Sequence, residues 1–103
     1  MNPMLTLDRI RLRTAEHYDV PLHLMLGKSR QPRVAFPRQV SLYLARTKLG
    51  LTLEDIGAQA GVHHTTVLLS VRAVQNRITT EPQERERVEQ LAVNITQAMT
   101  GNE

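Results

Sequence analysis

The chain has 103 residues, of which 41% are hydrophobic and 3% aromatic, and its formal net charge at pH 7 is +3. This length predicts one small domain, too short to hold a catalytic domain beside a recognition domain. The few aromatic residues disfavour a platform for stacking single-stranded bases, and the aliphatic composition favours a helical bundle.

The absence of cysteine excludes disulfide bonds and thiolate metal sites and is typical of a reducing interior. Charged residues interrupt the first 26 residues, and no apolar run reaches membrane-spanning length. We therefore expect a soluble, cytoplasmic protein with neither a signal peptide nor a membrane span.

The positive charge is unevenly distributed. Residues 1 to 80 hold 11 Lys and Arg against 5 Asp and Glu, a net charge of +6, whereas residues 81 to 103 hold 2 against 5, a net charge of −3. Nucleic-acid binding would explain this excess, but many cytoplasmic domains carry surplus basic residues, and charge alone favours that plainer interpretation.

Apolar spacing predicts helices in the first half of the chain. A helix from Thr6 or Asp8 would bury one face, and Pro21 fits the first turn of a short helix that ends at Gly27. A third helix is expected from Pro37 to Gly50. The expected buried positions are Leu7, Ile10, Thr14 and Tyr18 in the first of these helices and Val40, Tyr43, Leu44 and Thr47 in the third.

Residues 27–36 form the longest irregular stretch expected and carry Lys28, Arg30 and Arg33 with few apolar anchors. Such a basic loop can contact phosphates or enter the DNA minor groove if it lies beside a DNA-binding helix. The alternative is a solvated loop held away from the core by its charge. Arg38 and Gln39 would follow in the first turn of the next helix, where a cation is unfavourable unless a phosphate lies nearby.

Residues 51–78, LTLEDIGAQAGVHHTTVLLSVRAVQNRI, have the layout of a helix-turn-helix. Thr52 can cap a first helix that begins at Leu53, and Asp55 can return a bond to the cap backbone. Gly61 tolerates the left-handed backbone of a helix ending, and a turn over residues 61–64 is expected. The second helix would bury a stripe made of Val67, Val71, Val74 and Ile78.

The opposite face of this second helix is expected to face outward, toward a DNA groove. At its start, free backbone N–H groups and the positive end of the helix dipole favour phosphate. The outward residues are His64, Thr65, Leu69, Arg72 and Asn76, flanked by Thr66, Ser70, Ala73 and Arg77.

A last, acidic helix is expected from Pro82 to about Met99, with Thr79 or Thr80 as its cap. We assign residues 1–80 to the helix-turn-helix domain and residues 81–103 to this helix. Packing on the same domain is favoured over pairing with another copy, because its apolar stripe is short for a coiled coil. The stripe consists of Val88, Leu91, Ile95 and Ala98 or Met99.

From about Leu5 to Ile78 the sequence resembles the C-terminal DNA-binding domain of the bacterial replication initiator DnaA. The similar segments are AEHYDVPLHLMLGKSR, VAFPRQVSLYLAR, LEDIG and HHTTVLLSVRAV. The resemblance implies an all-α bundle of about five to six helices that binds a short duplex element, the DnaA box. It also implies minor-groove insertion by Arg30, phosphate contacts by Arg38, Gln39 and Arg46, and base and phosphate contacts by His64, Thr65 and Thr66.

The chain departs from this family at two positions of the turn and one of the outward face. Val62 replaces an arginine, His63 replaces an aspartate that helps to read a base, and Leu69 replaces a second histidine. Aspartate accepts from cytosine N4, whereas histidine can accept or donate and leucine offers only apolar contact to a thymine methyl group. We therefore expect altered base preference with the positioning contacts retained.

Other functions are less well supported. A protein-interaction module that uses Leu69 and the last helix is the principal alternative, and self-association through that helix is possible. Gly27-Lys28-Ser29 lacks the upstream glycine of a nucleotide-binding loop. His63 and His64 are adjacent, which is poor spacing for one metal ion, and His17 and His23 lack carboxylate partners, so we expect no metal, cofactor or catalysis.

Overall fold

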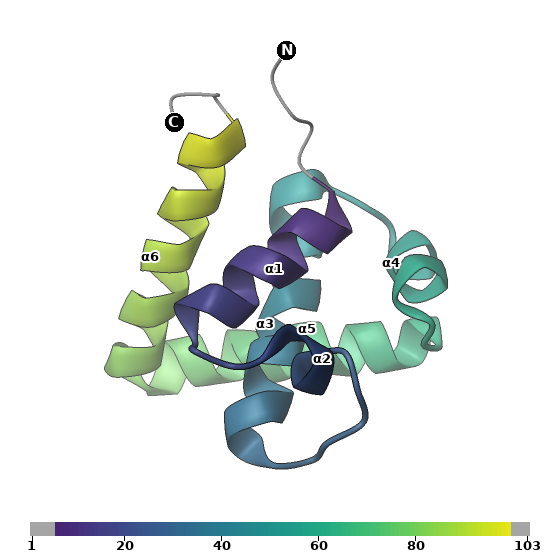
Figure 1. Cartoon of the computed structure of the whole chain (residues 1–103), viewed down its shortest axis with the longest axis horizontal. Coiled ribbons are helices and arrows are strands. Elements are labelled where there is room, and N and C mark those ends of the chain that lie inside the picture. Colours follow the sequence, from purple (N-terminus) through teal and green to yellow (C-terminus); the bar gives the residue numbers. More distant parts are fainter. Residues whose placement is uncertain (1–5, 100–103) are drawn as a thin grey trace.

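The computed structural model describes residues 6–99, which form six α-helices and no strand (Figure 1). This confirms the predicted all-α bundle of five to six helices. The helices are α1 (Leu7–His17), α2 (Leu22–Met25), α3 (Pro32–Leu49), α4 (Leu53–Ala60), α5 (His64–Thr80) and α6 (Pro82–Met99).

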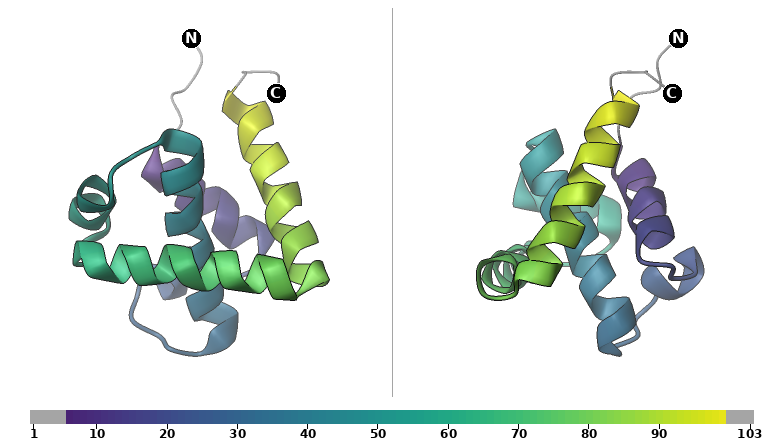
Figure 2. Two further views of the ribbon diagram at one scale, coloured as in Figure 1. Left: turned by 180° about the vertical axis from the view of Figure 1, so that it is seen from behind. Right: turned by 90° about the vertical axis from the view of Figure 1, so that its left-hand side faces the viewer.

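Helix α3 runs through the middle of the bundle and packs against α1 and α5. Helix α5 crosses α3, and α6 rises from the carboxyl end of α5 to pack beside α1 (Figure 2). The core between them is aliphatic, as the composition predicted. Its most deeply buried residues include Ile10, Val40, Leu44, Ile56, Val67, Val74, Leu91 and Ile95.

The helix-turn-helix forms as predicted. Thr52 Oγ1 accepts a bond from the backbone N–H of Asp55 at 3.0 Å, so α4 begins at Leu53. Gly61 ends α4 with a φ of 74°, and α5 starts two residues after Val62, at His64. The turn folds back closely on α4, because a Cβ on Gly57 would lie 2.6 Å from the Val62 carbonyl oxygen. Only glycine fits there without a shift of the backbone.

The expected start of the third helix was wrong. Helix α3 begins at Pro32, five residues before Pro37, which lies inside it. Val34 and Phe36 are buried at 2% and 6% exposure. Burying two such side chains gains roughly 1.5–3 kcal/mol each, against a cost of roughly 3 kcal/mol for proline inside a helix. The irregular basic segment therefore shrinks to residues 26–31.

Three further expectations about single residues were wrong. Thr79 and Thr80 do not cap α6, because α5 continues through both and their hydroxyls bond back to the carbonyls of Gln75 and Asn76. Thr47 is exposed, whereas Val40 and Leu44 of the same expected stripe are buried. On α5, Ser70 is buried at 6% exposure instead of facing outward.

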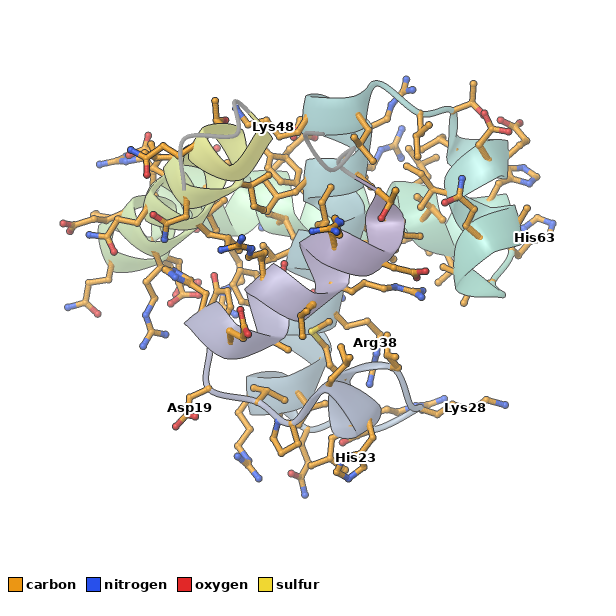
Figure 3. The ribbon with its side chains drawn as sticks, turned by 45° about the horizontal axis from the view of Figure 1, so that its top comes forward. Asp19, His23, Lys28, Arg38, Lys48 and His63 are labelled. Atoms are coloured by element: carbon orange, nitrogen blue, oxygen red, sulfur yellow. The ribbon has the colours of Figure 1, made fainter. Side chains whose placement is uncertain are left out.

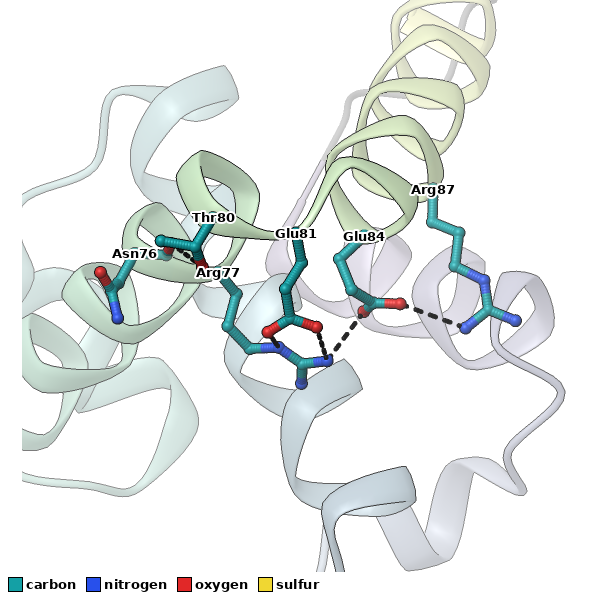
Figure 4. A network of polar contacts seen from close by, with 6 residues as sticks. All are labelled: Asn76, Arg77, Thr80, Glu81, Glu84 and Arg87. Atoms are coloured by element: carbon teal, nitrogen blue, oxygen red, sulfur yellow. Dashed lines mark hydrogen bonds and ion pairs between the residues drawn. The ribbon is translucent and has the colours of Figure 1, made fainter.

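Helix α6 packs into the same core as the rest of the bundle through Val88, Leu91 and Ile95. The side chains of Ala98 and Met99, also expected on this stripe, lie outside the described residues. Ion pairs secure the α5–α6 corner, where Arg77 contacts Glu81 at 3.0 Å and Glu84 at 3.6 Å (Figure 4). The division of the chain at residue 80 stays a prediction. No helix in residues 6–99 is long and apolar enough to cross a membrane.

Candidate nucleic-acid interface

The amino-terminal end of α5 is capped by a side chain. His63 is the N-cap residue, and its Nδ1 accepts a bond from the backbone N–H of Thr65 at 3.1 Å. The His63 and His64 rings are neighbours, with their centroids 4.2 Å apart and their planes tilted by 32°. His64, Thr65 and Thr66 are exposed. The helix therefore begins with a ridge of polar side chains.

Exposed apolar side chains lie next to this ridge, on the outward face of α5 and in the turn before it. Leu69 is 59% exposed and Val62, in the turn, is 39% exposed. Arg72 is exposed, whereas Arg77 lies with its guanidinium carbon 4.0 Å from the centroid of the Phe36 ring. Arg77 therefore belongs to the fold and does not extend from the outward face.

The segment of residues 26–31 is held in place by Arg38 from the second turn of α3. The Arg38 guanidinium donates from Nε to Met25 O at 2.6 Å, from Nη1 to Ser29 O at 2.8 Å and from Nη2 to Leu24 O at 3.3 Å. Burial lowers the pKa of Arg38. The expectation that Arg38 lies in a first helical turn was wrong, and its cationic group instead satisfies the carbonyls at the end of α2.

The basic segment and the start of α5 lie on the same side of the molecule. In Figure 3, Lys28 and His63 project from one side, with Arg38 nearer the centre. A groove joins the two regions, since Leu26 and Gly27 line it together with Ala60 and Val62. Residues 35 positions apart in the sequence are thus brought side by side.

The remaining candidate residues occupy different places. Lys28 and Arg30 are exposed on the segment, and Arg33 is exposed in the first turn of α3. Gln39 is half-buried. Arg46 is exposed near the carboxyl end of α3 and donates to Leu51 O at 2.7 Å, which holds the connection to α4.

Sequence reasoning missed Arg11. This half-buried residue of α1 lines the same groove as Arg38 and Val62. Its position next to Ile10, on the border of the buried stripe of α1, was the available signal. Among residues 6–99, no cluster of three or more His, Asp or Glu is arranged to hold a metal ion.

A family described as "Bacterial dnaA protein helix-turn-helix" matches residues 7–74, from the first turn of α1 into α5. The chain belongs to this family. The dnaA helix-turn-helix match includes the groove, the basic segment and the start of α5, so the three departures at Val62, His63 and Leu69 lie within it.

Relatives named "Chromosomal replication initiator protein DnaA" share this dnaA region. The chain is 37% identical to the protein of Cereibacter sphaeroides over 79 residues, covering 76% of this chain and 17% of the relative. The chain is 34% identical to the protein of Oenococcus oeni over 93 residues, which cover 89% of this chain and 21% of the relative. It is 33% identical to the protein of Methylacidiphilum infernorum over 100 residues, which cover 96% of this chain and 21% of the relative. The chain thus spans about a fifth of the length of these initiators.

Proposed function

We propose that this chain binds duplex DNA without catalysis, with the start of α5 in the major groove and residues 26–31 at the minor groove or the phosphates. The observation that supports this most is the juxtaposition of two regions on one side of the bundle. A helix-turn-helix places the amino-terminal residues of its second helix on base edges, and a basic arm beside it can enter the neighbouring minor groove.

The contacts divide into those that read bases and those that hold the backbone. Base-reading contacts are assigned to Arg30, His63, His64, Thr65, Thr66 and Leu69. Phosphate contacts are assigned to Lys28, Arg33, Arg38, Gln39, Arg46 and Arg72. Every side chain of the base-reading group is exposed, as contact with a base requires.

The DNA element is proposed to be a DnaA-box-like site in replication-origin or regulatory DNA, and the protein is proposed to act in the cytoplasm on the nucleoid. The relatives of this chain are named chromosomal replication initiators. The altered residues Val62, His63 and Leu69 are expected to change which sequence is preferred.

Salt dependence tests the proposal. With about five phosphate contacts, the logarithm of the association constant should fall with the logarithm of salt concentration with a slope near −4 or −5. Fluorescence anisotropy of labelled duplexes between about 50 and 200 mM salt measures this slope. An affinity that does not change with salt, or no duplex binding at low salt, would overturn the proposal.

A second candidate function is protein binding through the same face. The observation in its favour is the exposure of Leu69 at 59%, with Val62 exposed at 39% in the adjoining turn. An apolar contact at these residues would hold a partner at high salt, where phosphate contacts fail. A partner complex stable in high salt and lost in Leu69→Asp, in a protein that binds no duplex at low salt, would support this function over DNA binding.

A further inference from the structure

The groove between residues 26–31 and the turn before α5 is lined by two arginines from different helices. Arg11 comes from α1 and Arg38 from α3, and the apolar residues Leu26, Ala60 and Val62 form part of the walls. Apolar walls exclude water and strengthen the field of charges that they surround. The two positive charges would therefore attract an anion to the groove.

Neither guanidinium is neutralised by a carboxylate of the described residues. Arg38 donates three of its five N–H groups to backbone carbonyls, so two N–H groups are left to bind a ligand. Arg11 forms no ion pair within residues 6–99, although the charge of Asp8, three residues earlier, partly offsets the effect of burial on its pKa. Burial lowers the pKa of both arginines. Both positive charges are partly removed from water without an ion-pair partner, and an entering anion would supply one.

The position of the groove between the two proposed DNA-contacting regions indicates which anion would enter it. One end of the groove is Leu26 and Gly27, beside the basic segment, and the other is Val62, beside the His63 cap. If the proposed function is correct, a DNA strand that is contacted by both regions must pass over the space between them. The phosphodiester groups are the only charged groups that this strand presents to the groove.

We propose that a backbone phosphate of the bound duplex lies between Arg11 and Arg38, which makes Arg11 a DNA-binding residue. This inference rests on the proposed function and adds a contact from α1, outside both the helix-turn-helix and the basic segment. The contact is independent of base sequence, because it addresses only the phosphodiester. It positions the strand between the two regions that reach the grooves.

Arg11→Gln tests the contact, with Arg9→Gln as the matched control. Arg9 lies on the same helix, is exposed and does not line the groove, so both variants lose one charge from α1. Binding of a short labelled duplex, enriched by selection from random sequences, is measured by anisotropy across a salt series. Arg11→Gln should flatten the log-log slope by about 0.9, and Arg9→Gln should leave the slope within about 0.3 of the wild type.

A second measurement locates the phosphate. Each backbone phosphate of the duplex is replaced in turn by an uncharged methylphosphonate. At one position the replacement should weaken the wild-type protein more than Arg11→Gln, because the variant has already lost the Arg11 contact and keeps only that of Arg38. Circular dichroism of each variant establishes that it is folded, and Arg11→Lys should recover part of the affinity by restoring the charge.

The outcomes separate the two proposals. If the wild type binds duplexes but every methylphosphonate costs it and Arg11→Gln the same, the Arg11 contact is wrong and the proposed function stands. If NMR shows inorganic phosphate at the Arg11 side chain while no duplex position couples to it, the groove is a free-anion site and the inference is likewise overturned. If the wild type binds no duplex, the proposed function itself fails.

Discussion

The Nδ1 atom of His63 accepts a hydrogen bond from the backbone N–H of Thr65 at 3.1 Å. A backbone N–H can only donate, so Nδ1 must carry a lone pair, and in a neutral imidazole the other nitrogen then carries the proton. The nitrogen that His63 can direct to a ligand is therefore the donor Nε2–H. An aspartate in the same capping position would present a carboxylate oxygen, which only accepts.

This relationship predicts opposite effects of two substitutions at the cap. Aspartate and asparagine both cap helices well, but asparagine still presents an N–H donor, whereas aspartate presents an acceptor. The wild type and His63→Asn should prefer a base edge with acceptors, such as guanine O6 and N7. His63→Asp should shift the preference toward the cytosine N4 donor. Selection of random duplexes by the three proteins measures the change.

The comparison has an internal control, because both variants keep a cap and their stabilities should agree within about 0.5 kcal/mol. Replacement of the preferred guanine by 7-deazaguanine removes the N7 acceptor and should weaken the wild type and His63→Asn more than His63→Asp. If all three proteins enrich the same sequence, His63 does not read a base.

Replacing Arg30 or Arg38 by alanine should change DNA affinity and stability in different ways. Arg30 is exposed and forms no hydrogen bond within residues 6–99, so Arg30→Ala should leave stability unchanged and lower affinity mainly for narrow, A·T-rich minor grooves. Arg38→Ala removes three bonds to the carbonyls of Leu24, Met25 and Ser29. It should weaken binding to all duplexes and lower the free energy of unfolding by roughly 1–3 kcal/mol.

Duplexes with A·T-rich and G·C-rich flanks, measured at several salt concentrations, distinguish the two arginines. Hydrogen exchange of the amides of residues 26–31 should be faster in Arg38→Ala than in the wild type, because its anchor is gone. Equal losses of affinity across all sequences for both variants would contradict the assignment of Arg30 to the minor groove.

The sequence was sufficient to predict features that depend on neighbours along the chain. The Thr52 cap, the left-handed Gly61 and the α5 stripe of Val67, Val71 and Val74 all follow from local spacing, and the structure contains each of them. Leu69 was likewise expected to be exposed, because it lies opposite that stripe. Local rules of this kind need no knowledge of tertiary packing.

Features that depend on distant partners were not predictable in the same way. The start of α3 at Pro32 depends on the burial of Val34 and Phe36 against other helices, which outweighs the proline rule at Pro37. The role of Arg38 depends on carbonyls 9 to 14 residues earlier in the chain. The approach of Arg11 to that same groove also requires the tertiary fold.

Arg77 should contribute to stability mainly through its contact with Phe36. Its guanidinium lies 4.0 Å from the ring centroid, whereas its ion pair with Glu81 joins two partly exposed side chains and contributes little. Arg77→Ala should lower the free energy of unfolding by roughly 1–2 kcal/mol, and Glu81→Gln by no more than about 0.5 kcal/mol. Urea denaturation measures both.

The matched control for Arg77 is Arg85→Ala on the neighbouring helix, where the arginine is exposed and the change should be within about 0.5 kcal/mol. A loss in Arg77→Ala that disappears at high salt would show that the ion pairs, and not the contact with Phe36, hold the α5–α6 corner.

Tyr18 couples stability to alkaline pH. Its hydroxyl is buried without a hydrogen-bond partner, and burial, reinforced by Glu84, raises its pKa from 10.0 to about 12, with Arg87 and Arg77 acting in the opposite direction. The native state therefore holds the phenolic proton more tightly than the unfolded chain does. This contribution to stability is complete below pH 10 and is lost as the pH rises through about 12.

Tyr18→Phe removes a group that has no partner to lose, so at neutral pH it should be neutral or slightly stabilising. Phenylalanine does not titrate, so between about pH 10 and 12 the variant should gain stability relative to the wild type as the pH rises. Urea unfolding of both proteins at several pH values measures the difference, and Tyr43→Phe controls for loss of a tyrosine elsewhere. A difference that stays constant across this range would contradict the raised pKa, because an unshifted phenol would titrate alike in both states.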